Sequence, residues 1–460
     1  MRSVVAEDRL APIADHGAYW TDGLAPLSVT HSDILSKADV VIIGSGYTGM
    51  HAAIVTASQG KITQVLESQT PGWGCSTRNG GQISSSIKPT LQQLTKRFGA
   101  ERARAIRAEG QKSLDWIEAF ITTYGIDCNF MRNGRFHAAH TPRHFEKLVA
   151  EAQRLSVEEN VPTIIVPRQD QHKELGTDAY FGGVVFTQHA SVHPAKYYAG
   201  ILQTALDAGA RVPGHCPATA IGRSGDGFIV STPKGKIKAG KVVVATNGYS
   251  GSLMPYVKRR LIPIGSYIIA TEPLAKSVMD RLFPKDRVVS DSCKVVYYYR
   301  PSPDRSRILF GGRVSANETN PSISGPKLQK NLYRIFPELK GCGISHSWSG
   351  TVAFSFDELM HIGQQDGVHY ALGYCGSGVG MASYLGMRLG QQVAGLAEGQ
   401  TAFDNLPFPT RPFYRGNPWF LPAMVGWYQW RDRWQCQRAH KNSAKTYAGQ
   451  FAGNLTKNVG

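Results

Sequence analysis

The strongest constraint on the fold is a glycine-rich turn between an apolar run and a helix-forming segment near the N-terminus. Ala38–Ile43 is largely branched and apolar, which is typical of a strand buried in a parallel sheet. Three glycines follow, at Gly44, Gly46 and Gly49, and Met50–Ser58 then has the composition of a helix. In such a turn the first glycine permits the tight bend, the second lets the backbone approach a pyrophosphate, and the third lets the helix pack on the strand.

The segment after this helix completes a β-α-β unit. Thr63–Glu67 is predicted to be the second strand, and Glu67 ends it about 20 residues after the glycines, where a carboxylate can accept hydrogen bonds from a ribose. The N–H groups and the dipole at the start of the helix favour the charge of a phosphate. The predicted cofactor contacts of this unit are Gly44, Ser45, Gly46, Tyr47, Thr48, Gly49, Glu67 and Ser68. NAD and FAD both bind to turns of this kind, so the pattern alone leaves the cofactor open.

Three later segments favour FAD over NAD. The loop Gly72–Gln82 offers several backbone donors and one guanidinium, which suits a diphosphate or a flavin ring. The apolar strand within Val242–Ser250 leaves its sheet at a glycine, and Gly373–Gly386 repeats the order of strand, glycine turn and helix. A helix that begins near Gly378 can direct its positive end at the flavin ring. The further predicted cofactor contacts are Gly74, Ser76, Arg78, Asn79, Gly80, Gly81, Gln82, Ala218, Thr246, Gly248, Gly376, Gly378, Val379 and Gly380.

In this order, these segments resemble the D-amino-acid oxidase-like flavoprotein superfamily, and within it the γ-glutamylputrescine oxidase-like amine oxidoreductases. The resemblance covers nearly the whole chain and includes His193-Pro194 before a helix, Tyr297–Arg313, Trp348–Gly363 and Pro418–Trp434. It implies an α/β fold (α+β overall), with a Rossmann-type FAD-binding domain of the glutathione-reductase kind and a substrate domain built on an antiparallel sheet. The expected division is an N-terminal arm (1–37), a discontinuous FAD-binding domain (38–90, 185–255 and 345–400), a substrate domain (91–184 and 256–344) and a basic, aromatic C-terminal tail (401–460).

The family resemblance implies an enzyme that oxidises a C–N bond of a primary or secondary amine, such as γ-glutamylputrescine or another polyamine-like compound. In such enzymes hydride passes from the amine-bearing carbon to the flavin, the resulting imine is hydrolysed, and oxygen is reduced to hydrogen peroxide. We expect the FAD to be noncovalent, because neither Cys75 nor Cys375 falls where relatives carry a covalent link.

Two departures from relatives bear on the substrate and the electron acceptor. Val352 stands where α-amino-acid oxidases place a carboxylate-binding arginine, and an aliphatic side chain cannot form that bidentate pair. This favours an amine whose acidic group, if it has one, lies further out. Ile308–Phe310 lacks the oxygen-activating lysine of sarcosine oxidases, so either O2 or another acceptor can serve. Two alternatives stay open: an amino-acid or imino-acid oxidase whose substrate carboxylate is held by Arg300 or Arg313, and a membrane-surface amine dehydrogenase that reduces a quinone or a partner protein.

Three residues are candidates for a catalytic role in contact with the amine: Gln82, Tyr298 and Trp348. Gln82 either lines the active site or caps a turn. Neighbouring side chains of a strand point to opposite faces of the sheet, so if Tyr298 faces the flavin, Tyr297 and Tyr299 do not. Core packing is the alternative role for each tyrosine, and Trp348 can form an aromatic wall for the amine.

Charge and cysteine content narrow the remaining function classes. The formal net charge of +17 comes without a nucleic-acid-binding motif, so we interpret it as surface charge and expect no nucleic-acid partner. The seven cysteines are scattered and form no C-x-x-C pair, which predicts free thiols and no metal site. No apolar run resembles a secretory signal or a membrane span, which predicts a cytoplasmic protein. The tail, rich in Arg, Lys and Trp, can contact a membrane surface, its own chain or a second subunit of a homo-oligomer.

Overall fold

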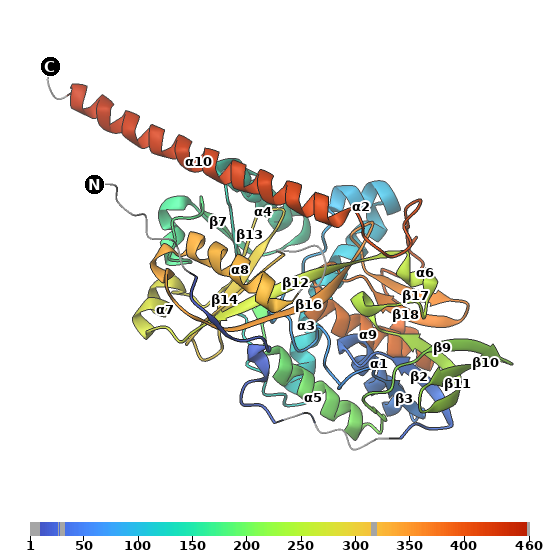
Figure 1. Cartoon of the computed structure of the whole chain (residues 1–460). Helices are drawn as coiled ribbons and strands as arrows, with labels where there is room; N and C mark the ends of the chain where they lie inside the picture. Colours follow the sequence, from blue (N-terminus) through green and yellow to red (C-terminus); the bar gives the residue numbers. More distant parts are fainter. Residues whose placement is uncertain (1–9, 26, 28–32, 314–319, 458–460) are drawn as a thin grey trace.

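Two large β-sheets, one of seven strands and one of nine, organise the chain. The computed structural model describes residues 10–25, 27, 33–313 and 320–457, and within the last helix it describes side chains up to residue 441. In Figure 1 the seven-stranded sheet lies at the lower right beside α1, and the nine-stranded sheet lies at the upper left beside α8. The predicted mixed α/β fold class is confirmed by this arrangement of sheets and helices.

Helices and strands alternate along most of the chain. The helices are α1 (Tyr47–Ser58), α2 (Leu91–Phe98), α3 (Ala100–Thr123), α4 (Pro142–Glu159), α5 (Pro194–Asp207), α6 (Pro255–Lys258), α7 (Lys276–Leu282), α8 (Pro321–Ile335), α9 (Gly378–Ala394) and α10 (Leu421–Lys457). The strands are β1 (Ile13–Asp15), β2 (Lys37–Ile43), β3 (Thr63–Leu66), β4 (Gln82–Ile83), β5 (Arg135–Ala138), β6 (Thr163–Val166), β7 (Gly183–Phe186), β8 (Ala190–Ser191), β9 (Ala220–Ser224), β10 (Gly227–Thr232), β11 (Gly235–Val244), β12 (Leu261–Thr271), β13 (Val288–Asp291), β14 (Tyr297–Pro301), β15 (Ile308–Gly312), β16 (Ile344–Ser355), β17 (His361–Gln365) and β18 (Val368–Leu372).

The seven-stranded sheet has a parallel centre, in which β3, β2, β11 and β18 are neighbours in this order. β17 adds an antiparallel edge, and β9 and β10 extend the sheet beyond the first half of β11. The apolar residues of β2 are buried because α1, α3, α5 and α9 pack on one face of the sheet and a second apolar cluster covers the other. The carboxyl ends of the parallel strands therefore meet at one edge, where ligands of such sheets bind.

The nine-stranded sheet is largely antiparallel, in the order β1, β16, β12, β15, β14, β13, β5, β7 and β6. The tyrosine run in β14 follows the predicted alternation: Tyr297 and Tyr299 belong to the apolar cluster under α8, and Tyr298 points to the opposite face. The described part of the N-terminal arm packs against this sheet, because β1 pairs with β16 and Trp20 is fully buried. β16 also belongs to this sheet, although nearly all of it lies within residues 345–400, which are predicted to be part of the FAD-binding domain; the domain limits stay a prediction.

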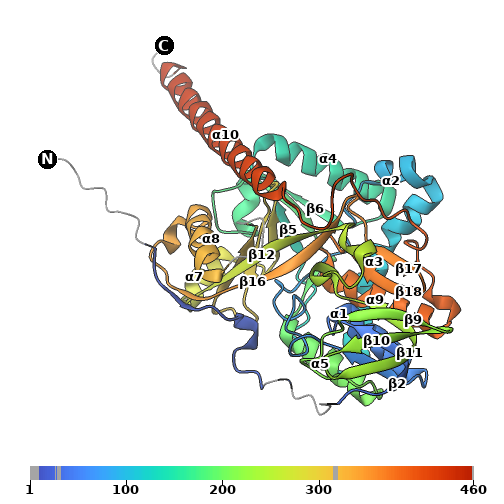
Figure 2. The same cartoon turned by 45° about the vertical axis from the view of Figure 1, so that its right-hand side comes forward.

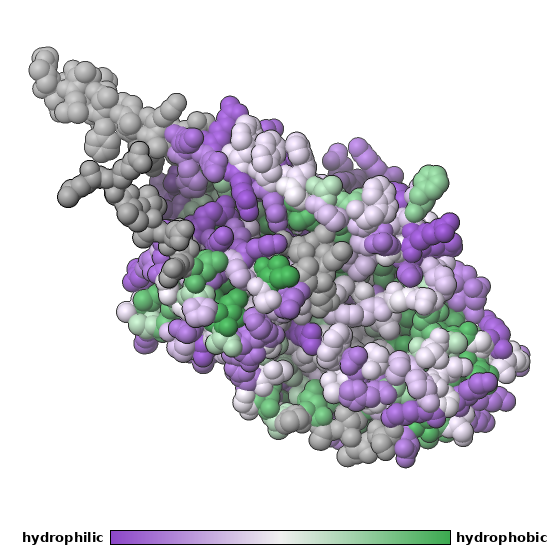
Figure 3. All heavy atoms as spheres, in the orientation of Figure 1, coloured by the Kyte–Doolittle hydropathy of each residue, from purple (hydrophilic) through white to green (hydrophobic). Residues whose placement is uncertain are grey.

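The C-terminal helix α10 crosses the nine-stranded sheet and then projects from the body of the molecule (Figures 1 and 2). Its inner face is buried at Leu421 and Asp432, whereas Trp427, Trp430 and Trp434 are each about half exposed. Figure 3 shows hydrophilic side chains along this edge and only small, scattered hydrophobic groups on the face in view. Among the described residues, none of the helices has both the length and the apolar character needed to cross a membrane.

Candidate active site

The first β-α turn has the backbone geometry that its three glycines predict. Gly44 has a φ of +99°, a value that side chains rarely allow, and it bends the chain out of β2. A Cβ on Gly49 would lie 1.9 Å from the carbonyl oxygen of Gly44, so only glycine lets α1 approach β2 this closely. At the N-terminus of α1, Gly46 provides no side-chain cap, and the first turn contains no acidic residue. The backbone N–H of Tyr47 donates to the Ser76 hydroxyl at 3.0 Å, and the rest of the positive end of the helix is available to an anion such as a pyrophosphate.

Glu67 follows the end of β3 and lies beside this turn. Its Oε2 atom accepts hydrogen bonds from the backbone N–H of Ser45 at 3.1 Å and from the Ser45 hydroxyl at 2.7 Å. Its Oε1 atom accepts from the Ser68 hydroxyl and from the backbone N–H of Gln69. These bonds hold the carboxylate next to the glycine turn, where a ribose of a dinucleotide would need it.

The loop between Gly72 and Gln82 is held in place by Asn79. The Asn79 amide donates to the carbonyl oxygens of Cys75 and Ser76, and its Oδ1 atom accepts from the N–H of Gly81 at 2.8 Å. Gly81, with a φ of +66°, has no room for a side chain, because a Cβ would lie 2.2 Å from the carbonyl oxygen of Val192. The Asn79 side chain thus fixes the loop by hydrogen bonds to the loop's own backbone, and the inner face of the loop can line a ligand cavity.

These elements enclose a cavity of about 1020 Å³, large enough for a dinucleotide and a small substrate. Of the residues predicted from the sequence, those that line it are Gly44, Ser45, Gly46, Tyr47, Thr48, Glu67, Ser68, Gly74, Ser76, Arg78, Asn79, Gly80, Gln82, Ala218, Thr246, Tyr298, Gly376, Gly378 and Val379. The structure therefore brings together, in one cavity, glycine turns that are more than 300 residues apart in the chain.

Five predicted residues do not line this cavity. Gly49 and Gly81 lie behind it in the close contacts described above, and Gly248 packs against Thr351, whose carbonyl oxygen would be 2.8 Å from an added Cβ. Gly380 faces Ile83 and Ser113 inside the core. These four glycines belong to the glycine-rich segments that the sequence pattern identifies. In the structure each of them packs closely against other parts of the protein and does not line the cavity.

Trp348 is the fifth of these residues, and its placement corrects the idea of an aromatic wall for the amine. Its ring is 2% exposed, and its Nε1 atom donates to the carbonyl oxygen of Arg78 at 2.8 Å. It faces a neighbouring hollow, beside Ala18 and Pro321, instead of the main cavity. Trp348 therefore supports the backbone of the Arg78 loop from behind.

The other two candidate catalytic residues do face the cavity. The Tyr298 hydroxyl lies 2.8 Å from the Ser266 hydroxyl, with both residues in the cavity wall. Burial raises the pKa of Tyr298 to about 12, so this phenol stays protonated and can donate a hydrogen bond at neutral pH. Gln82 begins β4, and its amide lies 3.5 Å from the carbonyl oxygen of Val289, a long contact that leaves the amide able to turn to a ligand.

The two arginines weighed for carboxylate binding have different environments. Arg300 is 2% exposed and donates to the carbonyl oxygens of Gly81, Val192 and Pro301, so its guanidinium is used within the protein. Arg313 lies in the wall of the cavity, with its guanidinium carbon 4.4 Å from the centre of the Phe354 ring. Of these two arginines, Arg313 is the one that lines the cavity.

Sequence reasoning missed Lys88 and Arg135, which also line the cavity. The Lys88 ammonium lies 5.1 Å from the centre of the Phe354 ring, and the Nε atom of Arg135 is buried and has no hydrogen-bond partner among the described residues. Both side chains are surrounded by protein and open to the cavity. The surface of Lys88 is therefore exposed toward the cavity, while burial by the surrounding protein, followed by the charge of Arg313, lowers the pKa of its ammonium group. No spacing or motif marks these residues; only the fold brings them to the same place as Arg313.

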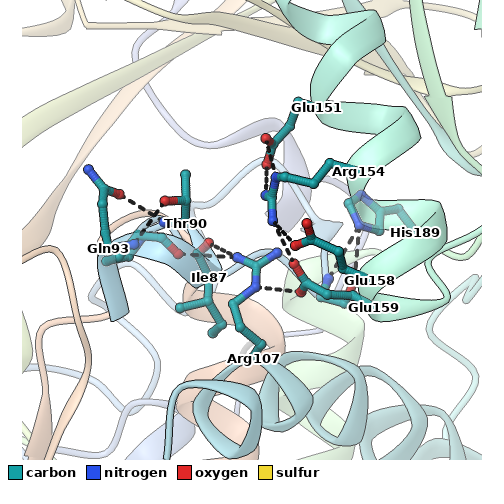
Figure 4. A network of polar contacts seen from close by, with 11 residues as sticks. Ile87, Thr90, Gln93, Arg107, Glu151, Arg154, Glu158, Glu159 and His189 are labelled. Atoms are coloured by element: carbon teal, nitrogen blue, oxygen red, sulfur yellow. Dashed lines mark hydrogen bonds and ion pairs between the residues drawn. The ribbon is translucent and has the colours of Figure 1, made fainter. Parts of the chain in front are cut away.

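A network of polar contacts fixes the segment that carries Lys88 (Figure 4). Arg107 of α3 donates to the carbonyl oxygen of Ile87 and, through Nε, to the Glu159 carboxylate at 2.6 Å. Two residues after Lys88, Thr90 caps α2 by accepting from the N–H of Gln93. Because Arg107 is paired with Glu159, it differs from Lys88 and Arg313, which form no ion pair with any described carboxylate.

The parallel sheet has an open glycine turn and a carboxylate at the end of its next strand, and a second, antiparallel sheet borders the cavity; these features define a dinucleotide-binding oxidoreductase. Residues 39–392 match the family described as FAD dependent oxidoreductase (DAO), and the chain belongs to this family. FAD is therefore the cofactor, and the glycine turn at the start of α1, Glu67 and the size of the cavity fit it.

Relatives and solved structures agree with this assignment. The chain is 30% identical to the γ-glutamylputrescine oxidoreductase of Escherichia coli, over 89% of this chain and 96% of that protein. Its fold is similar to that of glycine oxidase from Geobacillus kaustophilus, with a TM-score of 0.69 and 18% identity over 82% of this chain and 99% of the other. It is also similar to that of L-proline dehydrogenase from P. horikoshii, with a TM-score of 0.65 and 18% identity over 85% and 99% of the two chains. At such identities the two structures support the fold alone.

Proposed function

We propose that this enzyme oxidises the C–N bond of a primary or secondary amine that carries a carboxylate at a distance from the amine, with γ-glutamylputrescine-like compounds first among the substrates. The observation that carries the proposal is the pair of cations at Arg313 and Lys88, which face the cavity without a carboxylate partner among the described residues. A charge held by protein on most sides is costly unless an opposite charge joins it, so this part of the cavity favours an anionic group. The relative from Escherichia coli, named for a γ-glutamyl amine, supports the same substrate class.

The remaining side chains of the cavity suit binding and orientation of an amine. When bound, FAD supplies the chemistry by accepting the hydride from the amine-bearing carbon and passing the electrons to an acceptor. Tyr298, held by Ser266, can donate a hydrogen bond to the substrate, and Gln82 can hold a second polar group. Val352 lines the cavity and adds an apolar patch to its wall, which suits an amine better than an α-carboxylate. The amine loses one hydride and one proton, and water then hydrolyses the resulting imine to a carbonyl compound and the free amine or ammonia.

A second candidate is an amino-acid or imino-acid oxidase, because Arg313 alone could hold an α-carboxylate. The position of Arg300 favours the amine, since its guanidinium donates to three backbone carbonyl oxygens and does not face the cavity. For the acceptor we propose O2, which would give hydrogen peroxide. The alternative, a quinone or a partner protein reached at a membrane surface through the exposed tryptophans of α10, predicts little peroxide and fast reduction of an artificial dye.

Anaerobic stopped-flow reduction of the bound flavin tests the substrate class directly. We compare γ-glutamylputrescine, putrescine, which lacks the carboxylate, and a panel of α-amino acids. The proposal expects the fastest reduction with the carboxylate-bearing amine and slower reduction with putrescine. A simple α-amino acid that reduces the flavin faster than any amine would contradict it. Peroxide release in air, measured on the same samples, decides between O2 and another acceptor.

A further inference from the structure

A buried group of two thiols and one imidazole lies outside the cavity, at the junction of α10 with the nine-stranded sheet. β5 and β13 are adjacent and parallel in this sheet, with Ala138 opposite Asp291. His140 follows the end of β5 by two residues, and Cys293 follows the end of β13 by two residues. Parallel strands end at the same edge of a sheet, so this topology brings the two side chains together. α10 then crosses this edge and adds Cys436.

The ligand atoms of these three side chains all lie within 4.8 Å of one another. Around a tetrahedral zinc ion, thiolate and imidazole atoms lie roughly 3.3–3.8 Å apart, so closure needs a movement of about 1 Å, which rotation of a thiol can supply. His140 and Cys293 are 1% and 6% exposed, and a buried set of two sulfurs and one nitrogen is soft enough to prefer zinc over magnesium or calcium.

The surroundings orient the imidazole as a metal site requires. The Nδ1 atom of His140 lies 2.8 Å from the hydroxyl of Ser292, and the backbone N–H of His140 donates to the same hydroxyl. The Nε2 atom is hydrogen-bonded to the side-chain oxygen of Gln435 at 3.3 Å, next to Cys436, and a metal ion would replace this bond once the ring proton lies on Nδ1. A hydrogen bond to the outer ring nitrogen is the usual support of a metal-binding histidine.

A buried carboxylate oxygen supplies a second, independent observation. Asp432 lies four residues before Cys436, hence on the same face of α10, and its Oδ2 atom accepts from the N–H of Val295 at 3.0 Å. Its Oδ1 atom is buried and has no hydrogen-bond partner among the described residues, and its one printed ionic contact is with the Nη2 atom of Arg431 at 4.0 Å. A buried carboxylate oxygen with so little compensation is costly, and the positive charge of a metal ion bound by the neighbouring Cys436 would lower that cost.

We propose that His140, Cys293 and Cys436 bind a zinc ion that fastens α10 to the nine-stranded sheet, with a water molecule in the fourth position. The absence of a C-x-x-C pair argues against zinc only where ligands are close in sequence; here three separate segments supply them. The site is structural, since it is closed by protein and lies away from the glycine turns. It also stabilises the cavity wall, because Gln429 of α10 contacts the carbonyl oxygen of Arg313.

The test uses the full-length, FAD-loaded enzyme, purified without chelators and analysed for metal by mass spectrometry. We expect about one zinc per chain in the wild type and at least roughly a tenfold loss of zinc affinity in Cys436→Ser. Cys342→Ser is the matched control, because Cys342 is a free, partly exposed cysteine outside this group, and it should keep its zinc. Titration of the metal-stripped protein with Co²⁺ should give a thiolate-to-cobalt absorption band that Cys436→Ser lacks and Cys342→Ser retains.

Three results would overturn the proposal. The first is wild-type protein that neither contains zinc nor binds Zn²⁺ or Co²⁺. The second is equal metal content in Cys436→Ser and in the control. The third is a thiol titration showing that Cys293 and Cys436 form a disulfide in the purified enzyme. The bound flavin's absorbance in each variant reports folding, and loss of zinc with the flavin retained shows that the metal site is separate from the active site.

Discussion

Arg313 and Lys88 approach the same aromatic ring: the guanidinium carbon of Arg313 is 4.4 Å and the ammonium of Lys88 is 5.1 Å from the centre of Phe354. The two residues come from segments more than 200 positions apart, and both line the cavity. The ring offsets part of the cost of placing two like charges together through cation–π contacts. The rest of that cost is relieved when an anion binds, so this arrangement favours a substrate with an acidic group.

Arg313→Met should therefore weaken turnover of carboxylate-bearing amines and leave carboxylate-free amines almost unchanged. Loss of one charge-assisted contact inside the cavity costs about 2 kcal/mol, or roughly thirtyfold in kcat/KM. Lys88→Met should act in the same direction. Lys276→Met, which removes an exposed lysine paired with Asp280, is the control. Equal losses for γ-glutamylputrescine and putrescine would contradict the assignment, and release of FAD from the variant would instead assign the two cations to the cofactor.

Glu67→Gln should reduce the affinity for FAD more than it reduces the rate of flavin reduction. The carboxylate is held beside Ser45 by two hydrogen bonds and is placed to accept from a ribose. Replacing a charged acceptor by a neutral amide costs about 1.5–3 kcal/mol, which is roughly a tenfold to hundredfold rise in Kd. The recovery of flavin fluorescence on dilution measures this. Glu338→Gln on the surface serves as the control, and an unchanged Kd in Glu67→Gln would remove the ribose role.

Gly49→Ala should prevent α1 from packing on β2. The added Cβ would lie 1.9 Å from the carbonyl oxygen of Gly44, and backbone on both sides cannot move aside. We expect at least about 3 kcal/mol of lost stability and little bound FAD. Gly222→Ala in β9 is the matched control, because nothing lies within 4 Å of its added Cβ. Thermal unfolding and flavin absorbance report both effects, and a Gly49→Ala enzyme that is as yellow and as stable as the control would refute this account.

The sequence was most informative where one short segment fixes the local backbone. The strand, glycine turn and helix around Gly44 could be predicted because each step depends on neighbours in the chain, and α1 begins at Tyr47, three residues before the predicted start. The alternation at Tyr298 could be predicted for the same reason. For β16 the segment's own pattern was not sufficient, because the choice between the two sheets depends on pairing with β12 and β1.

The meeting of side chains through tertiary structure escaped prediction. Arg313, just after β15, was named as one of two arginines that could hold a carboxylate, but Lys88, in the loop before α2, was not named, because its position does not differ in sequence from that of an ordinary solvated cation. Trp348 showed the reverse error: a tryptophan in a family-like segment suggested a substrate contact, but its indole N–H is used by the carbonyl oxygen of Arg78. The group of His140, Cys293 and Cys436 has no sequence signal, since its members are separated by more than 100 residues.

His51 provides a prediction on pH-dependent stability. It packs edge-on against Trp116 and Phe120, with its Nε2 atom 3.1 Å from the Tyr197 hydroxyl, and burial lowers its pKa to about 3. Below the unfolded-state pKa of about 6.5 the unfolded chain binds a proton that the folded chain excludes, so this histidine's stabilising contribution is full above pH 6.5 and declines as the pH falls towards 3.

His51→Phe removes that decline and keeps an aromatic ring at this position, while the Tyr197 hydroxyl retains its bond to Ser383. Between pH 7 and pH 5 the unfolding free energy of the wild type, measured in urea, should therefore fall by about 2 kcal/mol more than that of His51→Phe. If the unfolding free energies of the two proteins fall in parallel between pH 7 and pH 5, His51 binds its proton equally in the folded and unfolded states, which would contradict this prediction.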